Sequence, residues 1–298
     1  MRYVRSGKIK LACRTWGDES NPILVLVHGY PDSSHVWLPV AKLLAEKYFV
    51  VAYDVRGCGY SSEPRFFWEY GLEQLEGDLL RVLDEFSPAR PVHLVGHDWG
   101  SIQCWQGVTS PKLAGRIASF TSISGPCLDH VAYRLREEFS HPDPEAWKAM
   151  GKQSIRSWYI GFFHIPVVAP LLWRLGLDKY WPQLLERLEG VAHSGVDPNQ
   201  RKEGKNGINL YRANILPRLL APRERHAHAP VQVILPSRDN YVTEALYRGV
   251  ERWVPQLRYQ TIDAGHWVLL TQPDALAKLI ADFVDENEGV AKGRAQMN

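Results

Sequence analysis

The chain has 298 residues, enough for one large α/β domain with a sizeable core. Its 35 Lys and Arg nearly balance 33 Asp and Glu, so the formal net charge of +2 excludes a strongly basic nucleic-acid-binding protein and favours a small neutral ligand. No stretch approaches the roughly 18 apolar residues of a membrane span, and the first residues lack the apolar core of a secretion signal. We therefore expect a cytoplasmic protein without a membrane span.

Short apolar segments alternate with amphipathic ones along most of the chain. The apolar segments are rich in β-branched residues and nearly continuous, as in strands buried on both faces of a parallel sheet. The amphipathic segments repeat apolar residues at three- and four-residue spacing, which is typical of helices. The pattern predicts an α/β fold with a mostly parallel central sheet flanked by helices. The expected strands are 23–29, 49–54, 92–97, 117–124, 230–236 and 258–263, and the expected helices begin near Trp37, Leu72 and Thr271.

The interval from about Cys127 to Arg225 interrupts this alternation. It is rich in Trp, Tyr, Arg and Pro and indicates several helices without strands, which we interpret as a helical cap inserted into the fold. The last residues are polar and aperiodic, as in a frayed end or a linker. The expected division is a first part of the core at 1–127, a cap at 128–228, a second part of the core at 229–285 and a polar tail at 286–298.

Metal and disulfide chemistry have little support in the sequence. The four cysteines are scattered and form no CxxC pair, so we expect buried, reduced thiols. His226 and His228 lie in one polar loop, but no carboxylate or thiol stands beside them. We therefore expect neither a metal nor a cofactor.

The segment Gly96-His-Asp-Trp-Gly100 follows an expected strand and precedes a helix, the setting of a nucleophile elbow. Asp98 holds the central position. An aspartate here could instead merely cap the following helix. Asp239 and His266 each follow a later strand, and the chain order of nucleophile, acid and histidine is the one expected for this architecture. The carboxyl ends of parallel strands share one edge, so all three residues would meet there. Asp129, after the strand at 117–124, is the alternative acid.

Two backbone N–H groups are candidates for an oxyanion hole. His28-Gly-Tyr-Pro31 follows the first expected strand and can aim the N–H of Tyr30 at a developing negative charge. The N–H of Trp99, directly after Asp98, would be the second donor.

Through the motifs GHDWG, HGYP and the later GHW, the chain resembles the α/β-hydrolase superfamily over almost its whole length. Within it, the motifs are similar to those of epoxide hydrolases and haloalkane dehalogenases, whose nucleophile is an aspartate. The resemblance implies an alkyl ester on Asp98, hydrolysed by a water that His266 and Asp239 activate. It also implies that two cap tyrosines, Tyr159 and Tyr211, donate to the epoxide oxygen. Residue 210 is a leucine here, where that family frequently has a tryptophan.

Epoxide hydrolysis and dehalogenation differ in the leaving group that the site must stabilise. For a dehalogenase, Trp99 could bind halide through its indole, but Tyr30 stands where many such enzymes carry an asparagine. We therefore expect a lipophilic epoxide, bound by Trp99, Tyr30, Phe162 and Trp267. The alternatives are a haloalkane dehalogenase and a non-catalytic ligand-binding receptor. The sequence does not determine the natural substrate, the selectivity or the choice between monomer and homodimer. It also leaves open a fusion to a dehydrogenase domain, which some related hydrolases carry.

Overall fold

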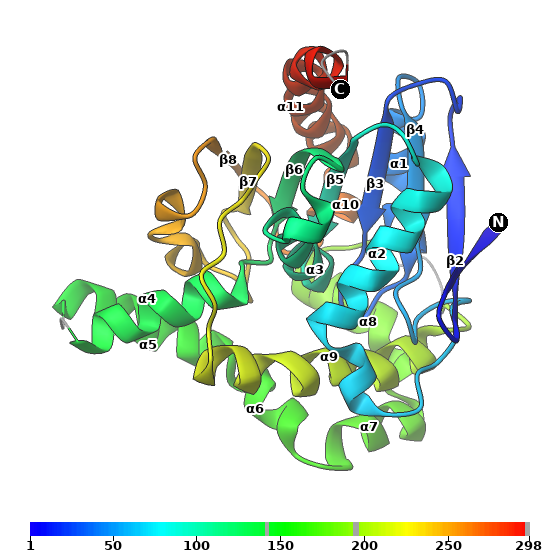
Figure 1. The fold of residues 1–298 in the computed structure, drawn as a ribbon. Helices are drawn as coiled ribbons and strands as arrows, with labels where there is room; N and C mark the ends of the chain where they lie inside the picture. The colour runs from blue at the N-terminus through cyan, green and yellow to red at the C-terminus, as the bar shows by residue number, and fades with distance from the viewer. Residues whose placement is uncertain (141–142, 193–196, 296–298) are drawn as a thin grey trace.

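The computed structural model describes residues 1–140, 143–192 and 197–295. Its centre is an eight-stranded sheet with the order β1-β2-β4-β3-β5-β6-β7-β8 (Figure 1). β1 and β2 pair with their neighbours antiparallel, and the remaining strands run parallel. The strands are β1 Arg2–Ser6, β2 Ile9–Trp16, β3 Ile23–Val27, β4 Phe49–Tyr53, β5 Val92–His97, β6 Ile117–Ile123, β7 Val231–Pro236 and β8 Leu257–Ile262.

The expected mostly parallel sheet is confirmed, and each of the six expected strands is present. The two N-terminal strands were not among the expected elements. β1 lies at the edge of the sheet and exposes most of its residues, and β2 is exposed at Lys10. Charged residues on an edge strand interrupt the apolar pattern that marks a buried strand.

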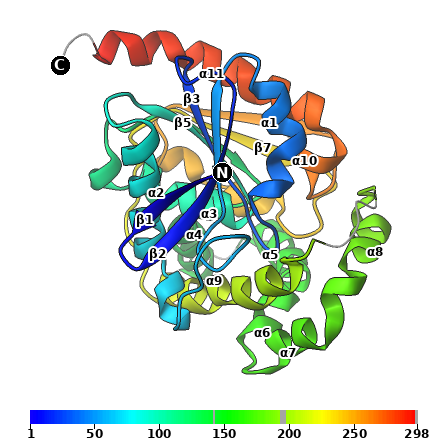
Figure 2. The same cartoon turned by 90° about the vertical axis from the view of Figure 1, so that its right-hand side faces the viewer.

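Helices cover both faces of the sheet because alternate residues of each buried strand point to opposite sides. Val25 and Val27 of β3 belong to the cluster that contains the apolar residues of α2 and α3. Leu24 and Leu26 belong to the cluster formed with α1, α10 and α11 on the other face (Figure 2). These helices are α1 Leu38–Leu44, α2 Leu72–Phe86, α3 Trp99–Val108, α10 Val268–Thr271 and α11 Pro273–Ala295, with 3-10 turns at Ser34–Trp37, Phe67–Tyr70, Pro111–Leu113, Glu244–Tyr247 and Val250–Arg252.

The expected polar tail at 286–298 is wrong for its first ten residues, because α11 continues to Ala295. Ala, Glu, Lys and Arg favour helix even without an apolar stripe. Glu288 also ties the helix to the sheet, since its carboxylate lies 2.9 Å from Nε2 of His93 on β5. Residues 296–298 lie outside the described part of the chain.

In the described part of the interval between β6 and β7, the chain forms six helices and a π-helical turn. They pack below the sheet in Figure 1, on the side where the parallel strands end, and α9 lies between the sheet and helices α6 and α7. Within the described residues, no single helix is long and apolar enough to cross a membrane. All four cysteines are buried and unpaired. The helices are α4 Leu128–Ser140, α5 Pro144–Arg156, α6 Trp158–His164, α7 Val168–Leu172, α8 Asp178–Glu189 and α9 Gln200–Leu220, and the π turn is Trp173–Leu177.

Candidate active site

Asp98 occupies a sharp turn between β5 and α3. Its φ of 52° and ψ of −123° are rare for a residue with a side chain, so neighbouring packing must hold them. Two glycines allow the turn: a Cβ on Gly96 would lie 2.5 Å from Cα of Ser101, and one on Gly100 would lie 2.0 Å from the carbonyl oxygen of Val27. The carboxylate makes no capping hydrogen bond to α3, so helix capping does not account for this aspartate.

One oxygen of Asp98 is held and the other faces the imidazole of His266. The N–H of Tyr30 donates to Oδ1 of Asp98 at 2.7 Å, and the N–H of Trp99 also acts on this carboxylate. Oδ2 of Asp98 lies 3.8 Å from Nε2 of His266. The two backbone donors expected from the sequence therefore both act on this carboxylate.

Asp239 holds the opposite side of the same imidazole. Its Oδ2 lies 2.9 Å from Nδ1 of His266, and its Oδ1 accepts the N–H groups of Tyr241 and Val242 at 2.7 and 2.9 Å. Both side chains are almost fully buried. With Asp239 accepting at Nδ1, Nε2 is the nitrogen left to act toward Asp98.

The alternative acid, Asp129, lies elsewhere. Its carboxylate sits among cations, 3.3 Å from Nε of Arg225 and 3.6 Å from a guanidinium nitrogen of Arg218, and it accepts the N–H of Arg223 at 2.8 Å. Asp129 therefore fixes the chain between α9 and β7 in an arginine cluster, while Asp239 is the acid in contact with His266.

The protonation states of this group are coupled. Burial raises the pKa of Asp98 to about 6, although the charge of His266 and the N–H groups of Tyr30 and Trp99 oppose that rise. Burial alone would lower the pKa of His266, but the charges of Asp239 and Asp98 outweigh it and raise the pKa to about 9. Near neutral pH the site therefore holds an ionised Asp98 beside a protonated His266.

Tyr159 on α6 and Tyr211 on α9 meet above Asp98. Their ring centroids are 5.9 Å apart with the rings nearly perpendicular. Burial, together with the charge of Asp98, raises the pKa of both hydroxyls, which keeps them protonated. The side chain of Trp99 hydrogen-bonds to Tyr211, and the two rings lie 4.8 Å apart. Two neutral O–H donors thus line the same cavity as the Asp98 carboxylate.

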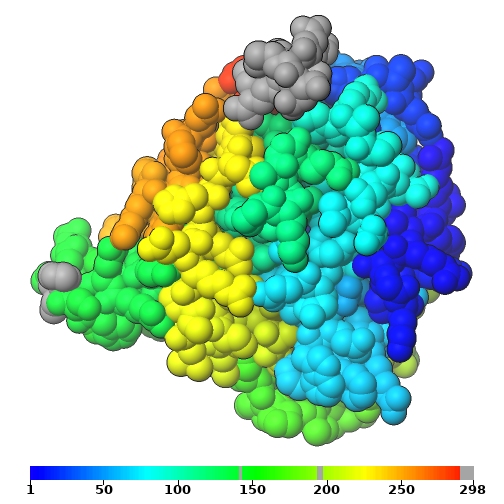
Figure 3. Space-filling model, in the orientation of Figure 1, coloured from blue at the N-terminus to red at the C-terminus, as the bar shows by residue number. Residues whose placement is uncertain are grey.

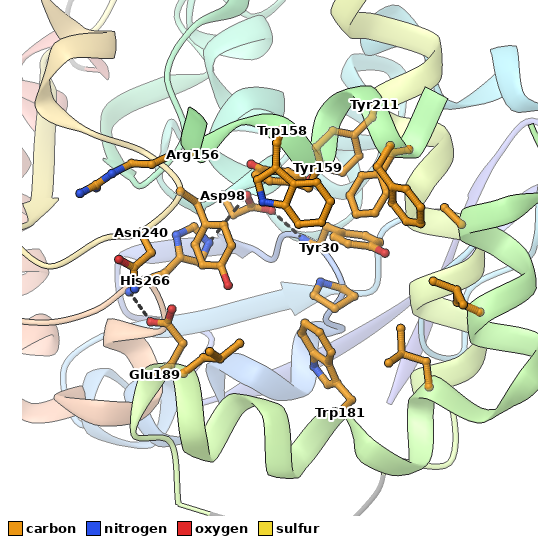
Figure 4. A pocket seen from close by; sticks show the side chains of 18 of the residues that line it. Tyr30, Asp98, Arg156, Trp158, Tyr159, Trp181, Glu189, Tyr211, Asn240 and His266 are labelled. Carbon is orange, nitrogen blue, oxygen red and sulfur yellow. Dashed lines mark hydrogen bonds and ion pairs between the residues drawn. The ribbon is translucent and has the colours of Figure 1, made fainter. Parts of the chain in front are cut away.

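A cavity of about 600 Å³ connects these groups (Figure 4). The figure shows Tyr159 and Tyr211 on one side, Glu189 and Trp181 on the other, and Asp98 and Tyr30 between them. Most of the lining is aromatic or aliphatic, as in a site for a lipophilic ligand. Of the residues expected to bind substrate, Tyr30, Phe162 and Trp267 line the cavity, whereas the Trp99 side chain is buried behind Tyr211 and does not. The lining includes Tyr30, Asp98, Arg156, Trp158, Tyr159, Phe162, Phe163, Leu172, Trp173, Trp181, Leu188, Glu189, Tyr211, Tyr241, His266 and Trp267.

Several polar residues of the site were not predicted, among them Glu189, Asp32 and Tyr241. Glu189, at the end of α8, accepts the N–H of His266 at 2.9 Å, and Asp32 accepts the indole N–H of Trp267 at 3.0 Å. Tyr241 packs on the His266 ring at 4.9 Å. Asp32 follows the HGYP loop directly and could have been found from that position, whereas no motif surrounds Glu189.

Residues 22–150 match the family model described as the alpha/beta hydrolase fold. The chain is similar to the probable oxidoreductase EphD of Mycobacterium tuberculosis, with 35% identity over 297 residues that cover 96% of this chain and 50% of that relative. Epoxide hydrolase A of the same organism shares 31% identity over 170 residues, covering 56% of this chain and 48% of the relative. The chain therefore spans about half the length of these curated relatives.

Solved structures agree with the fold. The crystal structure of Bacillus megaterium epoxide hydrolase in complex with an inhibitor aligns with a TM-score of 0.75 and 21% identity, covering 95% of this chain and all of the other. The sheet order, the strained elbow and the match of residues 22–150 show the α/β-hydrolase fold. Several of the relatives and structural neighbours that the chain resembles are named epoxide hydrolases.

Proposed function

We propose that this chain hydrolyses lipophilic epoxides to vicinal diols, with Asp98 as the nucleophile. The observation that carries the proposal is the position of Asp98: one oxygen is held by the Tyr30 N–H, the other faces His266, and two neutral tyrosine hydroxyls line the same cavity. A carboxylate attacking a carbonyl would give a labile anhydride, whereas attack on a strained tetrahedral carbon gives a stable alkyl ester. This arrangement therefore suits ring opening.

In the first half-reaction, Oδ2 of Asp98 attacks an epoxide carbon, and the carbon–oxygen bond of the ring breaks. The oxygen that leaves the carbon stays attached to the substrate and takes a proton from Tyr159 or Tyr211, which leaves that tyrosine as a phenolate. Both hydroxyls are protonated at neutral pH because burial and the charge of Asp98 raise their pKa. The product is a hydroxyalkyl ester on Asp98.

In the second half-reaction, His266 removes a proton from water, and the resulting hydroxide attacks the ester carbon. Esterification removes the charge of Asp98, one of the causes that raise the pKa of His266, so the imidazolium gives up its proton more readily. That proton restores the tyrosine that protonated the epoxide oxygen and leaves Nε2 of His266 free to accept a proton from water. The N–H groups of Tyr30 and Trp99 stabilise the tetrahedral intermediate. Its collapse expels the alkoxide of the diol, which takes the proton of the newly formed carboxylic acid, so Asp98 is ionised again. Asp239 stabilises the imidazolium of His266 meanwhile.

We also propose that residues 128–228 act as a cap over the core formed by 1–127 and 229–285. Tyr159 and Tyr211 both come from this interval, while Asp98, Asp239 and His266 come from the ends of core strands. The cap would thus bring the proton donors to the nucleophile and would exclude bulk water from the ester.

An epoxide is favoured over a halide because the indole expected to bind a halide, that of Trp99, is already engaged. The side chain of Trp99 hydrogen-bonds to Tyr211 and is buried behind it, so it is not directed at a leaving group in the cavity. The cap tyrosines instead offer O–H donors, which an alkoxide needs.

The test is diol formation from styrene oxide by the purified chain, compared with halide release from a panel of chloroalkanes. We expect diol and no halide. Asp98→Ala should abolish diol formation, and the double variant Tyr159→Phe, Tyr211→Phe should lose ring opening yet keep its folded circular-dichroism spectrum. Normal epoxide turnover in the double variant would contradict the choice of epoxides, and halide release by the unmodified chain would favour a dehalogenase.

A further inference from the structure

Helices α6 and α7 and the turn that follows them expose an unusual amount of apolar surface. They lie at the end of the molecule opposite α11 in two perpendicular views (Figures 1 and 2), and in Figure 3 this green segment forms the lower edge of the face. Exposed apolar groups of this density mark interaction surfaces. We call the following six residues the apolar patch: Trp158, Ile165, Val167, Leu171, Leu172 and Leu175, of which Leu175 is 75% exposed and none is less than 42% exposed.

The opposite side of the same segment is fixed to the protein. Ala169 and Trp173 are buried and pack with Ile208 of α9. Taken together, the helix pair Trp158–His164 and Val168–Glu189 has the length and apolar composition of a broken membrane span, with a bend of 90°. Because one side of the pair is packed against α9, only the other side is free for lipid, which is the arrangement of a helix lying in a membrane interface.

The mouth of the cavity lies within this surface. Trp158 and Leu172 line the cavity and belong to the apolar patch, and the neighbouring Ile155 and Leu188 also line the cavity and are 75% and 63% exposed. Anything that covers the patch therefore covers the mouth. A second protein copy seated there would close the cavity, whereas a lipid surface would supply it with apolar molecules.

The charge of the patch segment favours an anionic lipid surface. Residues 156–179 contain three basic residues, Arg156, Arg174 and Lys179, and a single acidic residue, Asp178. That acid is buried, and its carboxylate lies 3.1 Å from Nε of Arg201, so it is already paired. Basic residues beside an apolar face attract anionic headgroups, and the same charge would repel a second copy of this face.

We propose that the apolar patch docks this protein on membrane surfaces that contain anionic lipid, and that lipophilic epoxides enter the cavity directly from that surface. The second part rests on the proposed epoxide hydrolysis. The first part depends only on the exposed surface and its charge.

Docking is tested by flotation with vesicles of phosphatidylcholine, with and without phosphatidylglycerol. The full chain should float with the vesicles, more strongly when phosphatidylglycerol is present. The double variant Ile165→Glu, Leu175→Glu changes patch residues that do not line the cavity, and it should lower binding by about tenfold or more. The matched control is Leu220→Glu at the end of α9, where a leucine that is 74% exposed lies outside the patch; binding should be unchanged.

Measurements of epoxide turnover distinguish docking on the membrane from entry of the epoxide through the membrane surface. All three proteins should hydrolyse dissolved styrene oxide at the same rate, whereas a long-chain epoxide embedded in vesicles should be hydrolysed about tenfold more slowly by the double variant. Absence of flotation, or equal flotation of the double variant, would overturn docking whatever the turnover. A change from dimer to monomer in the double variant without vesicle binding would assign the patch to a second copy. Vesicle binding without any epoxide turnover would support docking and contradict the proposed function.

Discussion

Replacing Asp239 by asparagine should separate the two half-reactions. The carboxylate contacts Nδ1 of His266 at 2.9 Å, and its charge is the largest contribution that opposes burial and raises the pKa of His266. The rise from 6.5 to about 9 corresponds to about 3 kcal/mol of favourable interaction with the imidazolium. Asp239→Asn should remove roughly 2 to 3 kcal/mol of this, which slows ester hydrolysis on the order of 100-fold. An asparagine N–H donating to Nδ1 would also favour the tautomer that cannot accept a proton from water at Nε2, which adds to the loss.

Ring opening should change much less in Asp239→Asn, because Asp98 and the two tyrosines keep their places. Rapid quenching followed by mass analysis of the intact protein measures both steps: the ester should form within about tenfold of the normal rate and then persist. Asp263→Asn is the control, since this exposed acid lies near the same strand ends, where its carboxylate accepts the hydroxyl of Ser237 and pairs with the exposed Arg238. Ester hydrolysis that kept nearly its full rate would move the acid role to another residue, such as Asp129, and equal slowing of both steps would refute the division of labour.

Three further changes have defined outcomes. His266→Gln should form the ester once and then stall, which mass analysis would show as a permanent mass increase on the Asp98 peptide. If Asp98 were never alkylated in this variant, His266 would not act as the base of the second step alone. Attack needs the ionised carboxylate, and the pKa of Asp98 is raised to about 6. The single-turnover alkylation rate should therefore reach its full value well above pH 6 and fall as the pH drops through about 6. A rate that stays flat down to pH 4 would show that burial does not raise this pKa. Gly100→Ala should destabilise the fold by about 3 kcal/mol in urea denaturation, because its Cβ would meet a backbone carbonyl at 2.0 Å. Gly77→Ala, whose Cβ meets nothing within 4 Å in α2, is its control and should be neutral or stabilising.

The catalytic residues at the strand ends could be predicted because each directly follows a strand that the local sequence pattern identifies. Asp98, Asp239 and His266 each follow a buried strand, and parallel strands end at one edge, so their meeting follows from the topology alone. The turn at Asp98 could also be anticipated, since Gly96 and Gly100 flank it and each leaves no room for a Cβ.

The helices between β6 and β7 could be predicted only in outline. Tyr159 and Tyr211 were found through a family resemblance and not through any local pattern, and their distance from Asp98 depends on how α6 and α9 cross. Glu189 reaches the backbone of His266 from the end of α8, 77 residues earlier in the chain. Nothing in the sequence around it distinguishes this glutamate from a solvated one, because the contact is created by tertiary packing.

The nucleophile is tested most directly by one turnover in water that carries heavy oxygen. Excess protein is mixed with styrene oxide, the reaction is quenched after a single turnover, and both the diol and the peptide that contains Asp98 are analysed by mass spectrometry. Attack by Asp98 followed by hydrolysis at the ester carbon predicts a diol without heavy oxygen and one heavy oxygen on the Asp98 peptide. A diol that carries the heavy oxygen, with an unlabelled peptide, would mean direct attack of water on the epoxide and would contradict the covalent mechanism.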